Sequence, residues 1–365
     1  MLTETFKVDY QSILSENQYS LIRHPVRSTR ARLGDLLDEA DSNQQAEVYG
    51  QGELVNEFEK EIAQLLGHDA GLFLPSGTMA QVMALKIWSE EKQNTNIAFH
   101  PTSHLELHEQ HAYRELYRLK GVLVGQHDQV IKLSDLQNLS TEISALLVEL
   151  PMREIGGQLP GWDELEAQSK WAKEKGVAFH LDGARLWSCE SYYQKSLKKI
   201  ASLFDSVYVS FYKDLDGISG AMLLGNESFI EKARIWLRRT GGNLITMFPE
   251  ILAAKVGIKK HLPKMQDYVK KAQTIARYFE QCDNIKLIPV NPPCNLFHLV
   301  INQQDEELMP KVLEWSKHQR VTLLPLPRTC TLSTSRFEIT VGENALKLQD
   351  EQWQKLIKSF SQAIR

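Results

Sequence analysis

Short apolar runs in this chain are followed by side chains of the kinds that bind anions, form covalent bonds or carry protons. In open α/β sheets ligands bind just outside the carboxyl ends of the strands, so the residues after each run are the first candidates for chemistry. In chain order these are Ser76-Gly77-Thr78 after GLFLP, His104 after NIAFH, Glu149 in ALLVEL, Asp182 and Arg185 at and after the end of VAFHLD, and Lys213 after SVYVSFY.

Ser76-Gly77-Thr78 offers hydroxyl and backbone N–H groups at the expected start of a helix over about residues 78–90. A helix N-terminus favours an anion such as a phosphate, although serine and threonine there are also ordinary N-caps. The sequence has no GxxxxGK(S/T) loop, and no G-x-G-x-x-G follows a strand, which argues against nucleotide binding. The segment is therefore a candidate for holding a phosphate group of another kind.

Asp182 ends an apolar run, where an isolated carboxylate would carry a high desolvation cost and so needs a cationic partner. Arg185, three residues further on, is one possible partner in a simple salt bridge. A protonated pyridine nitrogen is the other, because a carboxylate there preserves the capacity of the ring to accept electrons.

Lys213 lies between an apolar strand and the glycine-containing segment DLDGISG. A solvated lysine at a turn is the structural interpretation. The functional one is an amine that forms a Schiff base, which requires burial or a neighbouring cation to lower its pKa.

A cluster of histidines and acids offers a third kind of chemistry, metal binding. Its segment HEQH is one residue short of the HExxH zinc pattern, and we predict no metal site and surface positions for His108 and His111. The members of the cluster are His100, His104, His108 and His111, with Glu106 and Glu109.

The elements that must position these residues alternate between short apolar strands and amphipathic helices from about residue 48 onward. That alternation predicts βαβ units and a mostly parallel sheet covered on both faces. After about residue 250 long helical patterns precede the apolar runs IKLIPV, LFHLVI and RFEITV. We predict an N-terminal arm (1–47), a large three-layer αβα domain (48–248) and a smaller α/β C-terminal domain (249–365).

Composition narrows the class of protein. The net charge is -4, with 42% hydrophobic and 24% charged residues, which is ordinary for a globular protein and gives no drive toward nucleic acid or a membrane surface. The sequence has no run of 18 apolar residues and no apolar leader at its N-terminus. Four scattered cysteines suit a reducing compartment, so a cytoplasmic location is predicted.

Several motifs together resemble a known family. From Val48 to about Gly242 the chain is similar to the threonine aldolase and β-eliminating lyase group of pyridoxal 5'-phosphate (PLP) enzymes, within the fold type I, aspartate-aminotransferase-like superfamily. The motifs are VYGQGELVNEFEKEIAQLLGHDAGLFLPSGTMAQ (48–81), HLELHEQHAYRELYRLKG (104–121), VELPMREIGGQLPGWDEL (148–165), VAFHLDGARLW (177–187) and SVYVSFYKDLDGISGAMLLG (206–225).

The resemblance implies a role for each candidate residue. PLP is the implied cofactor, with its phosphate at Ser76, Gly77 and Thr78 and its pyridine ring under His104. Asp182 would pair with the ring nitrogen, Lys213 would form the Schiff base, and Glu149 would support the cofactor. Arg185, also close to the cofactor, would bind the substrate carboxylate together with Arg336 in RFEIT.

The chain departs from the family pattern in three places. Leu150-Pro151-Met152 stands where members have Asn-Thr-His, whose histidine is associated with the substrate hydroxyl. Gly241-Gly242-Asn243-Leu244-Ile245-Thr246 lacks an arginine linked to phosphate binding across subunits, and YSLIRHPVRSTRAR has no Ser-Asp-Thr motif. The cofactor residues are retained, whereas part of the substrate-binding set has changed.

The predicted activity is retro-aldol cleavage of a β-hydroxy-α-amino acid, threonine or a relative, to glycine and an aldehyde. His104 is the candidate base, acting directly or through water. Alternatives are β-elimination, transamination or racemisation with the same cofactor, a histidine/carboxylate metallohydrolase, or a cofactor-binding protein without turnover. The resemblance also implies a homodimer or homotetramer with the active site at the subunit interface.

Overall fold

The computed structural model describes residues 6, 10, 12–13, 16–43, 45–331 and 333–365. The chain forms two compact units, each with its own sheet. The larger comprises Ser28–Glu154 and Leu159–Pro263, and the smaller Met1–Arg27, Ile155–Gln158 and Lys264–Arg365. The domain limits predicted after residues 47 and 248 stay predictions.

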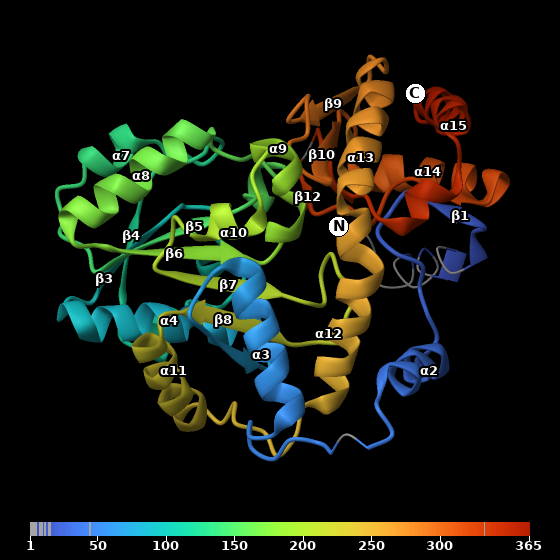
Figure 1. The fold of residues 1–365 in the computed structure, drawn as a ribbon. Coiled ribbons are helices and arrows are strands. Elements are labelled where there is room, and N and C mark those ends of the chain that lie inside the picture. Colours follow the sequence, from blue (N-terminus) through green and yellow to red (C-terminus); the bar gives the residue numbers. More distant parts are fainter. Residues whose placement is uncertain (1–5, 7–9, 11, 14–15, 44, 332) are drawn as a thin grey trace. The chain divides into compact units, whose positions relative to one another are not determined.

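A seven-stranded sheet forms the centre of the larger unit (Figure 1). Its order is β2-β8-β7-β6-β5-β3-β4, and neighbouring strands from β7 to β4 run parallel, whereas β8 is antiparallel to both β7 and β2. The central strands are buried along their whole length, as their aliphatic and aromatic runs require. The strands are β2 (Ala70–Leu74), β3 (Asn96–Phe99), β4 (Lys120–Leu123), β5 (Ala145–Glu149), β6 (Ala178–Gly183), β7 (Ser206–Ser210) and β8 (Ala221–Gly225).

Helices cover both faces of this sheet and complete the predicted three layers. Figure 1 shows α7 and α8 on one side and α4 and α11 on the other. The helices of this unit are α2 (Thr29–Glu39), α3 (Glu53–Leu66), α4 (Gly77–Lys92), α5 (His104–Leu107), α6 (Ala112–Glu115), α7 (Leu133–Gln137), α8 (Trp162–Lys175), α9 (Glu190–Tyr193), α10 (Leu197–Ala201), α11 (Glu227–Arg239) and α12 (Phe248–His261).

One predicted helix differs from the structure. The sequence predicts a helix that ends near Lys120, but two four-residue helices, α5 and α6, occupy this stretch. Between them Gln110 and His111 have φ of 51° and 56°. Non-glycine residues seldom take this left-handed conformation, and two in a row end the helical hydrogen-bond pattern.

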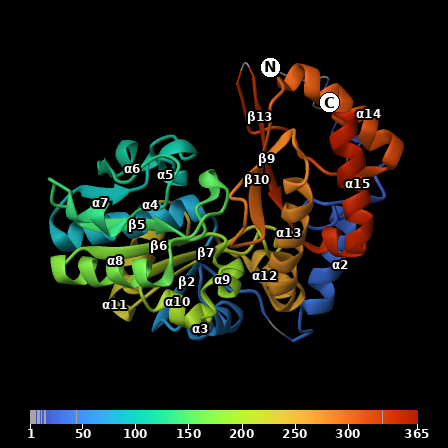
Figure 2. The ribbon, with the colours of Figure 1, turned by 90° about the horizontal axis from the view of Figure 1, so that it is seen from above.

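The smaller unit has a four-stranded antiparallel sheet in the order β12-β13-β10-β9, shown from another direction in Figure 2. Trp353, Phe279, Phe297 and Phe337 are among the fully buried side chains of its core. The strands are β9 (Ile285–Ile288), β10 (Leu296–Ile301), β12 (Thr329–Cys330) and β13 (Ser335–Thr340), and the helices are α13 (Met265–Glu280), α14 (Asp305–Gln319) and α15 (Asp350–Ala363).

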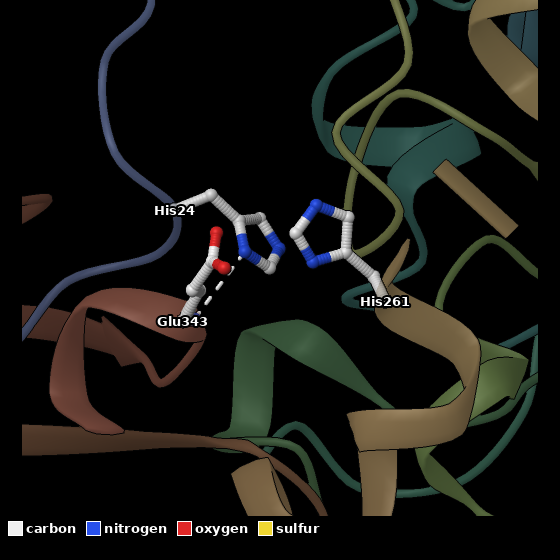
Figure 3. A group of neighbouring side chains, drawn as sticks. All are labelled: His24, His261 and Glu343. Atoms are coloured by element: carbon white, nitrogen blue, oxygen red, sulfur yellow. Dashed lines mark hydrogen bonds between the residues drawn. The ribbon is translucent and has the colours of Figure 1, made fainter. Parts of the chain in front are cut away.

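N-terminal residues contribute to the smaller unit. β1 (Tyr19–Ser20) pairs in parallel with β11 (Val321–Thr322). The backbone N–H of Glu343 donates to Nδ1 of His24 at 3.3 Å (Figure 3). Residues 19–24 are thus part of this unit, although the sequence pattern there gave no clean strand.

A buried charge cluster also lies in the smaller unit. Glu338, on β13, is 6% exposed and ion-paired with Arg328. His298 on β10 faces Glu338 in the strand register, with 4.0 Å between Nε2 and Oε2. Two strands and the preceding loop therefore hold this carboxylate.

No helix in the described part of the chain is long and apolar enough to cross a membrane. Cys189, Cys282 and Cys294 are buried free thiols.

Candidate active site

A cavity lies at the carboxyl ends of β5 and β6 in the larger unit. Glu149 ends β5, Asp182 stands beside it near the end of β6, and Tyr208 on β7 follows in the same register. The space amounts to about 320 Å³, part of it open to solvent. It is lined by His104, Glu149, Pro151, Arg153, Glu154, Asp182, Ala184, Arg185 and Lys213.

Lys213 brings an amine into this cavity from the loop after β7. Burial, followed by the positive charge of Arg185, lowers the pKa of Lys213 to about 8. The carboxylates of Asp182 and Glu149 act in the opposite direction. An amine with a pKa near neutrality has a substantial unprotonated fraction, the form that attacks a carbonyl carbon.

Two carboxylates stand side by side at the base of the cavity. Asp182 is 6% exposed, and its Oδ1 accepts a hydrogen bond from the backbone N–H of Ala184 at 3.0 Å. Burial and the neighbouring charge of Asp182 raise the pKa of Glu149 well above its ordinary value. Because like charges disfavour joint ionisation, Asp182 is the better placed of the two to meet a cation.

Glu149 also holds the segment that carries His104. One oxygen of Glu149 accepts the backbone N–H of His104 at 2.5 Å, which ties the start of α5 to the end of β5. The His104 side chain lines the cavity and is one-third exposed. Its Nδ1 lies 3.0 Å from Oε1 of Glu109.

The first turn of α4 lies at the same edge of the sheet, after β2. The Oγ of Ser76 accepts from the backbone N–H of Met79, so Ser76 is the N-cap, and Thr78 is exposed in the first turn. A side chain at Gly77 would collide with the hydroxyl of Tyr208, the neighbour of Asp182 on β7. This close approach requires glycine and brings a helix N-terminus beside the carboxylate pair.

The arginines that the sequence selected are in different units. Arg185, in the loop after β6, is 7% exposed and lines the cavity. Arg336 lies on β13 of the smaller unit, opposite Val300 of β10, and its role toward the substrate stays a prediction.

Three residues beside the cavity or His104 were not predicted from the sequence. Arg153 and Glu154 line the cavity directly after Leu150-Pro151-Met152, and their position just past the end of a predicted strand is the signal that identifies them. Glu109 was considered only as a metal ligand, whereas in the structure it contacts the ring of His104.

The histidine cluster does not form a metal site in the described part of the chain. His100 is buried, and its Nε2 lies 2.7 Å and 2.9 Å from the backbone oxygens of Gln126 and Gln129. His108 pairs with Glu154 at 2.8 Å, and His111 lies 3.6 Å from Glu106. Each histidine therefore has its own partner, which argues against the metallohydrolase.

The donor set of this edge matches PLP. A buried carboxylate suits a pyridinium nitrogen, an amine of lowered pKa suits an aldehyde, and the N-terminus of a 16-residue helix suits a phosphate. Together with the three-layer αβα fold around a mainly parallel sheet, these features define a PLP-dependent enzyme of fold type I. Residues 37–301 match the family model described as β-eliminating lyase, and the chain belongs to that family.

Known proteins agree with this placement. A Listeria monocytogenes EGD-E protein, provisionally assigned as an L-allo-threonine aldolase, has a crystal structure 36% identical in sequence, with a TM-score of 0.94 over 98% of this chain and 99% of that one. Low-specificity L-threonine aldolase 1 of Arabidopsis thaliana is 26% identical over 71% of this chain and 75% of its own length. Sphingomonas wittichii serine palmitoyltransferase, 16% identical with a TM-score of 0.66 over 92% of this chain and 82% of that one, shares the fold.

Proposed function

We propose that the protein cleaves a β-hydroxy-α-amino acid of the threonine type into glycine and an aldehyde, using PLP. The observation that carries this proposal is the Lys213 amine, with its pKa lowered to about 8, in one cavity with Asp182 and His104. Relatives named as threonine aldolases support the reaction type.

The first turn of α4, with Ser76, Gly77 and Thr78, is assigned to the cofactor phosphate. Asp182 would hold the pyridine nitrogen in its protonated form, and Lys213 would provide the amine for covalent attachment. PLP, when bound, supplies an electron sink for a bond broken at the α-carbon.

Arg185, which lines the cavity, is assigned to the substrate carboxylate, which suits the fork of a guanidinium. The role predicted for Arg336 stays a prediction. His104 takes the proton of the β-hydroxyl. The O–H electron pair then forms the carbonyl of the aldehyde, and the Cα–Cβ pair stays with the glycine fragment. Glu149 fixes the backbone of His104 during this transfer.

The test uses the purified full chain with PLP and threonine, allo-threonine and phenylserine. Glycine and aldehyde should form in equal amounts, and Lys213→Ala should reduce the rate to background and abolish the visible absorbance of the bound cofactor. Lys175→Ala is the control, because Lys175 is an exposed residue at the end of α8. Absence of cleavage of every β-hydroxy amino acid tried would refute the proposal.

A second candidate, β-elimination, is favoured by the replacement of the family histidine by Met152, which is 2% exposed. An apolar side chain removes one polar contact for the substrate hydroxyl. Serine distinguishes the two reactions, since elimination yields pyruvate and ammonia, whereas cleavage yields glycine and formaldehyde. Cysteine has no β-hydroxyl, so pyruvate formed from it reports elimination alone.

We also infer a homodimer. Val48, Tyr49 and Ile245 are 55%, 54% and 57% exposed, and the Tyr49 N–H donates to the Ile245 carbonyl at 2.9 Å, so they form one surface, the 48/245 patch. Contiguous exposed apolar surface of this kind is typical of protein interfaces. Sedimentation at graded concentrations tests it, and activity should decline in parallel with the dimer if the active site lies at the interface.

A further inference from the structure

His104 has two distinguishable ring nitrogens. Nδ1 lies 3.0 Å from Oε1 of Glu109. Nε2 has no hydrogen-bond partner among the residues that the structure describes. Because the ring lines the cavity, Nε2 is the nitrogen available to a substrate there.

Glu109 differs from the other acids that lie beside histidines of this segment. Its side chain is 2% exposed, whereas Glu106, which accepts the Tyr113 hydroxyl at 2.8 Å, and Glu154, which pairs with His108, are 22% and 17% exposed. A buried carboxylate is costly unless donors satisfy it, and the His104 ring supplies a donor to Oε1, while Oε2 is buried without a hydrogen-bond partner among the described residues.

A carboxylate beside one imidazole nitrogen selects the tautomer. A carboxylate only accepts hydrogen bonds, so it favours the proton on Nδ1 and leaves the lone pair on Nε2. It also stabilises the imidazolium formed when Nε2 takes up a proton, as in the orienting acid of a catalytic triad. Burial raises the pKa of Glu109, which makes its carboxylate a more basic acceptor for the Nδ1 proton.

We infer that Glu109 is a positioning residue for the reaction, which fixes the ring and tautomer of His104 so that Nε2 accepts the β-hydroxyl proton. This inference rests on the proposed function. It also explains how the reaction could proceed with Met152 in place of the family's second histidine. A single histidine, oriented by Glu109, then carries the proton transfer.

The first measurement needs neither cofactor nor turnover. In the cofactor-free protein, ¹⁵N NMR of the imidazoles at a pH where His104 is neutral should show His104 protonated on Nδ1. In Glu109→Gln the amide can also donate to Nδ1, so the signals should move toward the Nε2–H tautomer. The signals of the His104 ring nitrogens are assigned as those that disappear in His104→Asn. An unchanged tautomer in Glu109→Gln would overturn the inference.

The second measurement separates proton removal from the hydroxyl from general damage to the site. Glu109→Gln should lower kcat for cleavage by about 10-fold to 100-fold, the range typical of losing a carboxylate that orients a metal-bound histidine, with KM nearly unchanged. Exchange of the α-proton of glycine with deuterated water requires no hydroxyl proton to be removed, and it should keep its rate. Equal losses in both reactions would overturn the inference.

Glu106→Gln is the matched control, since it removes a carboxylate from the same segment, beside His111 instead of His104. It should leave the cleavage and exchange rates unchanged. In the His104→Asn background, Glu109→Gln should have no further effect on cleavage, because the two residues act as one unit. A wild-type protein that cleaves no substrate would refute the proposed function, while the NMR result would still decide whether Glu109 sets the tautomer.

Discussion

Each unit of the chain buries a carboxylate on a strand, and the two are equally exposed, yet their surroundings differ. Asp182 and Glu338 are both 6% exposed. Glu338 stands in the middle of an antiparallel strand, opposite His298 and ion-paired with Arg328. Asp182 stands near the end of a parallel strand, beside a second acid and facing a cavity.

The comparison shows what a parallel sheet contributes to chemistry. Its strands all end at one edge, so charged residues from distant parts of the sequence gather there and face a ligand. In the antiparallel sheet the partner of Glu338 comes from a neighbouring segment, and its charge is compensated within the unit. A buried charge at a strand end therefore indicates a site, and one in mid-strand indicates a structural pair.

The largest effect is expected at Asp182. Asp182→Asn removes a preorganised charge from the reacting centre, and turnover should fall by a factor on the order of 100 to 1,000. The melting temperature should change little, because the lost charge repels that of Glu149 but attracts the Lys213 ammonium. Glycine release and calorimetry measure the two effects. A destabilised but active variant would reverse the roles assigned to the two carboxylates.

Glu338→Gln should have the opposite effect, a loss of stability without a loss of turnover. It removes the carboxylate that is ion-paired with Arg328, and the free energy of unfolding should fall by about 3 kcal/mol. Turnover per folded molecule should stay at the wild-type value at temperatures below the transition. Denaturant unfolding followed by tryptophan fluorescence gives the first quantity, and a large loss of kcat in the folded protein would contradict the comparison.

A smaller effect, on dimer formation, is expected at the 48/245 patch. This patch belongs to the larger unit and includes neither of the two buried carboxylates, Asp182 and Glu338. Ile245→Glu places a charge on an apolar surface, and the dimer should weaken by about 2 kcal/mol, roughly 30-fold in its dissociation constant. Analytical ultracentrifugation measures it. Gln126→Glu, a change in the loop after β4, is the control, and an unaltered dimer in Ile245→Glu would exclude this patch as the interface.

The smallest effect concerns the pH dependence at Lys213. Capture of PLP by the cofactor-free protein should accelerate as the pH rises through about 8, because Lys213 loses its proton there. Arg185 and Arg153 lower this pKa, whereas Asp182 and Glu149 raise it. Arg153→Gln removes a cation, so its profile should move to higher pH.

The lowered pKa of Lys213 also determines how the free energy of unfolding changes with pH. An unfolded lysine keeps its proton to about pH 10.4, so between about pH 8 and that value the unfolded chain binds more protons, and the free energy of unfolding of the cofactor-free protein should gain a contribution that rises with pH. Lys213→Met should abolish that contribution. Arg114→Gln, an exposed position on α6, should leave the capture profile unchanged.

The sequence was sufficient for the parallel sheet and for the residues at its strand ends. Asp182, Glu149 and Lys213 were identifiable because each follows an apolar run, and such runs are visible without a structure. The contact between His104 and Glu109 was not, since it joins residues five apart across the end of α5 at Leu107, which no periodicity predicts. Arg336 shows a further limit, because the sequence assigns it a role in a site that belongs to the other unit.

The close approach of Tyr208 to Gly77 limits which residues these two positions can take during evolution. The tyrosine hydroxyl occupies the space that a methyl group at position 77 would need, so position 77 is not free to enlarge while Tyr208 is present. A larger residue at 77 would be accepted only with a smaller one at 208. Among relatives, these two positions, 131 residues apart in sequence, should therefore vary together.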